Sequence, residues 1–215
     1  MAELTNPFRP FETELDEARA LALLRAATDG ADDGELFLER RRSEALVFDD
    51  GRLKTASYNA SEGFGLRAVK GETAGYGHAT ELSEAALARA AETARLAVGD
   101  GGGTAADTPA RTNTKLYAEQ DPLGDAPFAG KVTLLREMDA YARALDSSVV
   151  QVSATLAASL QEVEILRPEG TRFADVRPMA RLNVSVTVER DGRRETGGVG
   201  GGGRHGLEGL MAPEH

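Results

Sequence analysis

The sequence contains no cysteine and no tryptophan, and its only histidines are His78, His205 and His215. The absence of cysteine excludes disulfides, thiolate metal ligands and a cysteine nucleophile within this chain. Zinc would therefore need histidine, aspartate and glutamate ligands. The sequence has no H-E-x-x-H or H-E-x-x-x-H pattern, and residue 209, after His205-Gly-Leu-Glu208, is glycine where H-x-x-E-H needs histidine. We expect no catalytic residue and no bound metal in this chain.

Basic residues are in deficit, with 25 Lys and Arg against 35 Asp and Glu. Because nucleic-acid affinity depends mainly on Lys and Arg that neutralise phosphates, this balance argues against a direct nucleic-acid partner. We interpret the basic run Arg40-Arg41-Arg42 as a strand that carries solvated charges. Neither a signal peptide nor an apolar run of roughly 18 residues is present, so we expect no membrane partner and a cytoplasmic location.

Hydrophobic periodicity predicts two helices and several strands in the first half. Thr13 is the expected N-cap of the first helix, with Asp16 three residues on and Gly30 at its end. From residue 35 to 80 the period changes to two, which predicts successive short strands, with hairpin turns at Asp50-Gly51 and Lys70-Gly71. A second helix follows Ser83, and its small side chains suit close packing on glycine-bearing strands.

The second half opens with a helix predicted over residues 128–145, followed by a meander of strands that turns at Asp191-Gly192. The predicted fold class is α+β, with mostly antiparallel sheets and helices packed on one face. Residues 99–114 have no apolar period and are rich in Gly, Thr, Asp and Ala. They predict two domains, an N-terminal α+β domain (1–112) and a central antiparallel-sheet domain (113–215) that is incomplete.

The glycine run at residues 197–203 contains six glycines in seven residues and formally satisfies the dinucleotide pattern G-x-G-x-x-G. That pattern acts between a parallel strand and a helix, whereas this run follows a predicted hairpin turn. Two other interpretations are a flexible linker and a strand edge that accepts an extended peptide or another chain. The candidate peptide or interface segment comprises Gly200, Gly201, Gly202, Gly203, Arg204 and His205.

Two stretches resemble a known family. "ASYNASEGFGLRAVKGETAGYGHAT" resembles the first conserved block of the TldD/PmbA proteins. "ADVRPMARLNVSVTVERDGRRETGGVGGGGRHGLEGL" is similar to the block that precedes the metal site in the TldD branch. The phrases R-P-M and R-L-N-V-S-V and the four glycines followed by arginine carry the resemblance. It spans about residues 35 to 212 and favours TldD over its paralogue PmbA, also called TldE.

The resemblance implies a cytoplasmic zinc metallopeptidase that works as a heterodimer with a PmbA/TldE-type subunit and processes unfolded or leader peptides. Some members carry the label "modulator of DNA gyrase". The family holds zinc with H-E-x-x-x-H and a later cysteine, and neither occurs here. We therefore expect an N-terminal portion of such an enzyme, inactive alone. The alternative is a non-catalytic peptide-binding or assembly module of the PmbA kind, and a nucleotide-binding protein is a distant third.

Overall fold

The computed structural model describes residues 4, 7–104 and 119–210, and its strands form one sheet. Neighbouring strands are antiparallel throughout, in the order β3-β2-β1-β4-β5-β6. The helices are α1 (Pro10–Thr13), α2 (Glu17–Ala27), α3 (Glu84–Val98) and α4 (Phe128–Leu145), with a 3-10 turn at Glu208–Leu210. The strands are β1 (Asp33–Asp49), β2 (Arg52–Lys70), β3 (Thr73–Ala79), β4 (Val149–Leu166), β5 (Arg172–Arg190) and β6 (Arg193–Gly203). The predicted α+β class is confirmed.

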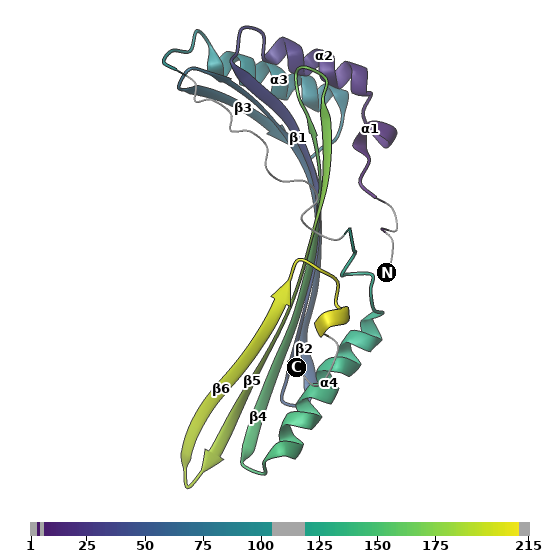
Figure 1. Ribbon diagram of the computed structural model, residues 1–215, viewed down its shortest axis with the longest axis vertical. Coiled ribbons are helices and arrows are strands. Elements are labelled where there is room, and N and C mark those ends of the chain that lie inside the picture. The colour runs from purple at the N-terminus through teal and green to yellow at the C-terminus, as the bar shows by residue number, and fades with distance from the viewer. Residues whose placement is uncertain (1–3, 5–6, 105–118, 211–215) are drawn as a thin grey trace.

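The sheet bends into a crescent whose helices lie along the convex side (Figure 1). We call the part that carries α2, α3 and β3 the upper arm, and the part that carries α4 and β6 the lower arm. Alternate residues of β1 reach the helix-covered face, so Leu36 and Leu38 join the core under α2 and α3, while Leu46 and Phe48 join the core of the α4 arm. One long strand thus contributes to both hydrophobic cores.

The helix ends follow local sequence signals with one correction. Ser83 caps α3 as predicted, since its side chain accepts from the Ala86 N–H. The predicted cap Thr13 was wrong: Asp16 caps α2 by accepting from Arg19 N–H at 2.8 Å, and Thr13 ends the short helix α1. An aspartate N-cap satisfies an unpaired amide as well as threonine does, so the sequence offered two equivalent starts. Helix α4 has the predicted bounds.

The prediction of successive short strands was wrong in length, although the turns at Asp50-Gly51, Lys70-Gly71 and Asp191-Gly192 are confirmed. β1 runs unbroken for 17 residues and β2 for 19. The polar residues 40–44 lie inside β1 and do not interrupt it. The boundary predicted near 99–114 falls mostly on residues outside the described part, so the two-domain division stays a prediction. Strands β1 and β4, from either side of it, pair directly.

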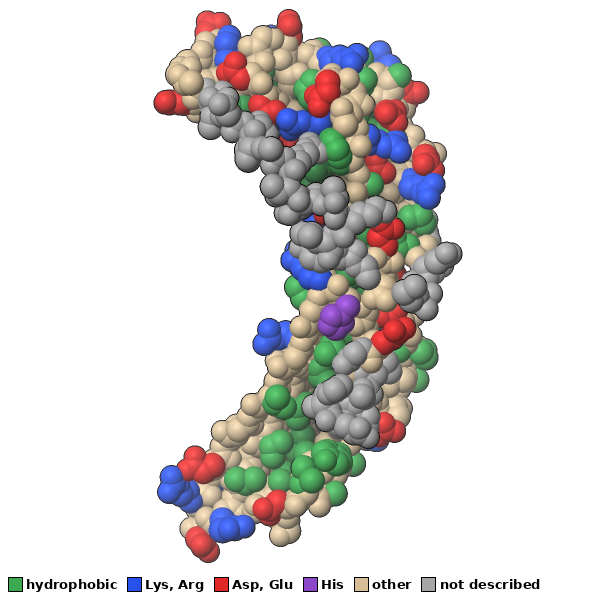
Figure 2. Space-filling model, viewed as in Figure 1, with side chains coloured by type: hydrophobic (Ala, Val, Ile, Leu, Met, Phe, Trp, Pro, Cys, Tyr) green, Lys and Arg blue, Asp and Glu red, His purple; other side chains and the backbone are tan. Residues whose placement is uncertain are grey.

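In the described part of the chain, no helix combines the length and the apolar character that a membrane span requires. Figure 2 shows basic side chains scattered among acidic ones over the upper arm, and a group of hydrophobic side chains on the lower arm. Exposed large hydrophobic residues of the lower arm include Phe128, Tyr141 and Leu145 of α4, Val150 of β4 and Val199 of β6.

Helix α3 packs unusually close to β3 because that strand carries glycines where the helix crosses it. A Cβ added at Gly77 would lie 2.2 Å from the Ala90 carbonyl oxygen, and one at Gly75 would lie 2.0 Å from that of Ala94. Small residues on both elements therefore set the distance between helix and sheet.

We expect Gly77→Ala to lower the free energy of unfolding by about 1–3 kcal/mol, because the methyl group forces α3 away from β3. Gly197→Ala is the matched control: it is also a strand glycine, but its Cβ would meet nothing within 4 Å. The control should change stability little or raise it slightly. Urea denaturation of both variants measures the difference, and equal effects would contradict this account of the packing.

Candidate functional site

A band of buried charge crosses the helix-covered face of the sheet between the two apolar cores. The Arg40 guanidinium donates to Glu162, with Nη2 to Oε2 at 3.0 Å, and the Arg42 Nη2 lies 3.1 Å from Asp121 Oδ2. The side chains of Arg40 and Arg42 are only 18% and 21% exposed. The interpretation of the arginine run as solvated charges was therefore wrong for both, while Arg41 on the opposite face is exposed.

Hydrogen bonds and ion pairs of this band hold two other segments against the sheet, the N-terminal segment and helix α4. Glu162 is 3% exposed and also accepts the Phe8 backbone N–H at 2.9 Å, which holds the N-terminal segment. Lys131 of α4 is 2% exposed, and its ammonium donates to Glu44 and to the Leu123 carbonyl, both at 2.8 Å. No local sequence signal marks these residues, because a buried charged side chain differs from an exposed one only in the neighbours that the fold brings to it.

We expect Glu162→Ala to lower the free energy of unfolding by about 3–5 kcal/mol, because a buried counter-charge of Arg40 is then removed, and Arg42 keeps only Asp121 of its two. Glu12→Ala, which breaks the exposed ion pair with Arg9, should cost no more than about 1 kcal/mol. Chemical denaturation at neutral pH compares the two. Similar losses for the two variants would show that the band is not a buried electrostatic contact.

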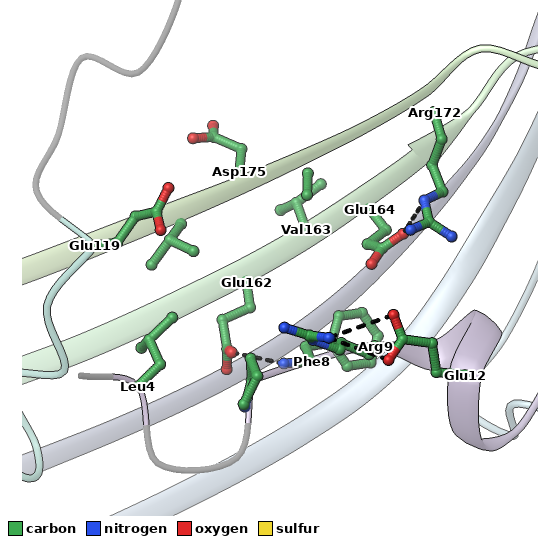
Figure 3. A pocket seen from close by; sticks show the side chains of 13 residues that line it. Leu4, Phe8, Arg9, Glu12, Glu119, Glu162, Val163, Glu164, Arg172 and Asp175 are labelled. Atoms are coloured by element: carbon green, nitrogen blue, oxygen red, sulfur yellow. Dashed lines mark hydrogen bonds and ion pairs between the residues drawn. The ribbon is translucent and has the colours of Figure 1, made fainter.

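An acidic cavity of about 380 Å³ lies beside Glu162, between the N-terminal segment and strands β4 and β5 (Figure 3). Its lining includes five carboxylates and two guanidinium groups, those of Glu12, Glu119, Glu162, Glu164, Asp175, Arg9 and Arg172. Arg172 Nε lies 3.3 Å from Glu164 Oε2. The cavity therefore favours cations over anions, which disfavours a phosphate ligand there.

Burial raises the pKa of the Glu164 carboxyl above its ordinary value of 4.5, against the opposing effect of Arg172. The nearby carboxylates of Glu12 and Glu17 raise it further. Since the folded-state pKa exceeds the unfolded one, the folded state binds more protons in the window between them. Stability is therefore lost as the pH rises through that window.

We expect Glu164→Gln to remove this loss, because the amide has the same shape and no charge to desolvate. The variant should gain stability relative to the parent as the pH rises from below 4.5 to neutrality. Urea denaturation of both proteins across that range measures the difference in the free energy of unfolding. A difference that is constant with pH, or that shrinks towards neutrality, would contradict the pKa direction.

The candidate segment Gly200–His205 lies at the opposite edge of the sheet from β3. β6 pairs with β5 on one side, Gly200 opposite Asn183 and Gly203 opposite Ala180, and no strand of the described residues pairs with its other side. The flexible-linker interpretation is thereby wrong, because the run is strand. It also lacks the context of a dinucleotide site, since the strand is antiparallel and no βαβ unit contains it.

A shallow hollow of about 360 Å³ lies on β4, β5 and β6 next to this edge. Small polar residues and glycines line it together with Val184 and Val199, namely Ser153, Thr155, Asn183, Ser185, Gly198 and Gly200. A Cβ at position 200 would meet the Asn183 side-chain oxygen at 2.2 Å, so any other residue there would displace the Asn183 side chain from this surface. The backbone of β6 is therefore bare beside a surface of hydroxyl and amide groups.

After β6 the chain turns back to the helix-covered face. His205 Nδ1 donates to the Gly206 carbonyl at 2.6 Å, Gly206 N–H donates to Gln120, and Leu207 is fully buried in the α4 core. Arg204 is exposed. His205 thus belongs to the turn that anchors the end of the glycine run.

The described residues, His205 and Glu208 among them, offer no group of three or more His, Asp or Glu side chains that could hold a metal. His78 is exposed and stacks on Tyr76, with ring centroids 5.5 Å apart. His215 lies outside the described residues. The donor set present here does not fit the zinc centre that the family resemblance implies, and no catalytic step is derived through one.

Comparison with known proteins identifies the family. The sequence profile of the PmbA/TldA metallopeptidase domain 1 matches residues 34–98, and that of the PmbA/TldA metallopeptidase central domain matches residues 121–213. The chain is 36% identical over 180 residues to a metalloprotease TldD homolog of Haemophilus influenzae, and 35% over 179 to one of Buchnera aphidicola from Schizaphis graminum. Each alignment covers 82% of this chain but only 37% of the relative. The chain belongs to the PmbA/TldD family of metallopeptidases.

Solved structures share the fold at low identity. TldE from Thermococcus kodakarensis matches with a TM-score of 0.67 and 17% identity, over 86% of this chain and 42% of that one. A Thermotoga maritima protein described as a modulator of a DNA gyrase matches with a TM-score of 0.70 and 16% identity, over 92% and 44%. The crescent sheet with its helices is therefore a fold of this family.

Proposed function

We propose that this chain is the N-terminal and central part of a TldD-type zinc metallopeptidase that processes unfolded or leader peptides. Its own work is to guide an extended peptide and to pair with a PmbA/TldE-type subunit. The metal and its ligands belong to the portion of the full-length relatives that this chain does not match. The chain by itself neither binds zinc tightly nor cleaves peptides.

Similarity to the relatives supports the first half of this proposal. They are named metalloprotease TldD homologs, and the chain spans about 37% of their length. The described residues contribute no ligand group, so hydrolysis needs residues from elsewhere. The likeness to a TldE in fold supports pairing between two subunits of similar architecture.

The bare edge of β6 is the observation that supports peptide guiding. A peptide that adds a strand to this edge gains main-chain hydrogen bonds, which do not depend on its side chains. The six glycines within residues 197–203 leave room for the side chains of the incoming strand. The hollow lined by Ser153, Thr155 and Asn183 extends to β6 and places hydroxyl and amide groups on the sheet face beside this edge.

A cytoplasmic location and the absence of a direct nucleic-acid partner are part of the same proposal. The net charge of −10 supports the second point, since it disfavours approach to phosphate. The alternative function is a non-catalytic peptide-binding or assembly module. It is favoured by the fold likeness to TldE and by the missing ligand group among the described residues.

The test uses the purified 215-residue chain and a short fluorescent peptide without secondary structure. We expect the peptide to bind and to stay intact with added zinc, and the metal content after dialysis to stay far below one zinc per chain. Amide hydrogen exchange should slow in β6 when the peptide binds, because the outward N–H groups gain partners.

A peptide of the same sequence with alternate backbone nitrogens methylated is the matched control. It should bind at least about tenfold more weakly, since each lost main-chain hydrogen bond contributes about 1 kcal/mol. A scrambled sequence should bind as well as the original. One tightly held zinc per chain, or cleavage by this chain, would refute the proposal that the metal and the catalytic residues lie outside it. Equal binding of the methylated peptide would refute strand addition.

A further inference from the structure

The other long edge of the sheet, along the lower half of β2, is open. β3 pairs only with residues 64–70 of β2 and lies wholly in the upper arm (Figure 1). Residues 52–63 therefore pair with β1 on one side, and no strand among the described residues pairs with them on the other. Their outward backbone N–H and C=O groups form a ready template for another strand.

This half-strand is exposed on both faces as well as at its edge. Every residue from Lys54 to Glu62 is exposed, because α4 packs on β4 and β1 and does not extend over β2. Tyr58 is 59% exposed. A regular strand of this length with three open sides gains little from its own fold, which points to an external partner.

Its sequence lacks the features that keep open edges from pairing. Between Thr55 and Ser61 there is no charged residue, no proline and no glycine. Two other open edges are different, because residues 172–178 of β5 carry charges and Pro178, and β6 begins with Arg193, Arg194 and Glu195. The outer edge of β3 is shorter and carries Gly75 and Gly77. Natural edge strands are usually protected by charge, proline or bulges, so an unprotected one is expected to be paired.

The segment is self-complementary about Tyr58. In an antiparallel pair with a second copy centred there, Tyr58 faces Tyr58, Ala56 faces Ala60, and Ser57 faces Asn59 of the copy. At each end of the paired stretch, Lys54 of one copy lies opposite Glu62 of the other, so the dimer would contain two such pairs of opposite charge. The register shift at Lys54 and the start of β3 pairing at Phe64 bound the open stretch.

We propose that residues 54–62 of β2 are a dimerisation edge, where two copies of this chain pair as antiparallel strands about a two-fold axis at Tyr58. The pairing joins the two sheets into one continuous sheet, since an in-plane antiparallel pair keeps like faces together. It requires neither a metal nor a peptide and is independent of the proposed function.

Analytical ultracentrifugation of the 215-residue chain across a concentration range tests this. We expect a monomer–dimer equilibrium, with slower amide exchange in residues 55–61 at high concentration. Lys54→Glu should weaken the dimer by about tenfold, and Glu62→Lys likewise, because each turns two attractive cross-strand pairs into repulsive ones. The Lys54→Glu/Glu62→Lys double variant should restore it.

Tyr58→Glu should also weaken the dimer, since it brings two like charges together on the axis. Val199→Glu is the matched control at the β6 edge, where the side chain is 68% exposed, and should leave the dimer unchanged. Circular dichroism checks that each monomer stays folded. A chain that is monomeric at all concentrations, a double variant no better than the single ones, or a dimer sensitive only to Val199→Glu would overturn the proposal.

Discussion

The pairing of β1 with β4 is the interaction on which the rest of the structure depends. It runs from Leu36 opposite Leu166 to Asp49 opposite Ser153, and it joins strands more than a hundred residues apart in the chain. Among the described residues, strands β1–β3 of the first half of the chain join strands β4–β6 of the second half only through it. Both matched family regions, 34–98 and 121–213, therefore share one sheet, whatever division the chain has in folding.

The register of that pairing is fixed at its centre by charge. Arg40 stands directly opposite Glu162, and a slip by one residue would turn each side chain of one strand to the wrong face. Apolar contacts fix the register at the two ends, but the pattern lapses between Leu38 and Leu46. Buried ion pairs add little net stability over apolar packing, so we interpret the band as a device for register and for fastening the N-terminal segment.

Local signals in the sequence predicted the parts of the fold that depend on few neighbours. Ser83 as a cap, the turns at Asp50-Gly51 and Asp191-Gly192, and the bounds of α4 were all predictable from residues within a few positions. The unbroken length of β1 was not predictable from local signals. Arg40 and Arg42 look like solvent-facing residues in the sequence, and only the fold places Glu162 and Asp121 of the second half beside them.

The candidate site divides in the same way. The placement of residues 200–203 on an edge strand followed from the hairpin turn and the strong alternation before it. The hollow beside them depends on Ser153 and Thr155, which reach β5 and β6 only through sheet order. Sequence spacing carries no information about such neighbours, since they are set by tertiary pairing.

Among the described residues, the lower arm has two short unpaired strand segments, one on β6 and one on β2, and their side chains differ in chemistry. On β6 the charged start at Arg193–Glu195 leaves the glycine run as the accessible part, and bare backbone suits a partner of any sequence. On β2 the stretch from Thr55 to Ser61 carries side chains that match a particular partner. The two segments lie on opposite edges of one sheet, β6 beside β5 and β2 beside β1. A partner on one edge therefore leaves the other free, because β1, β4 and β5 lie between the two edges.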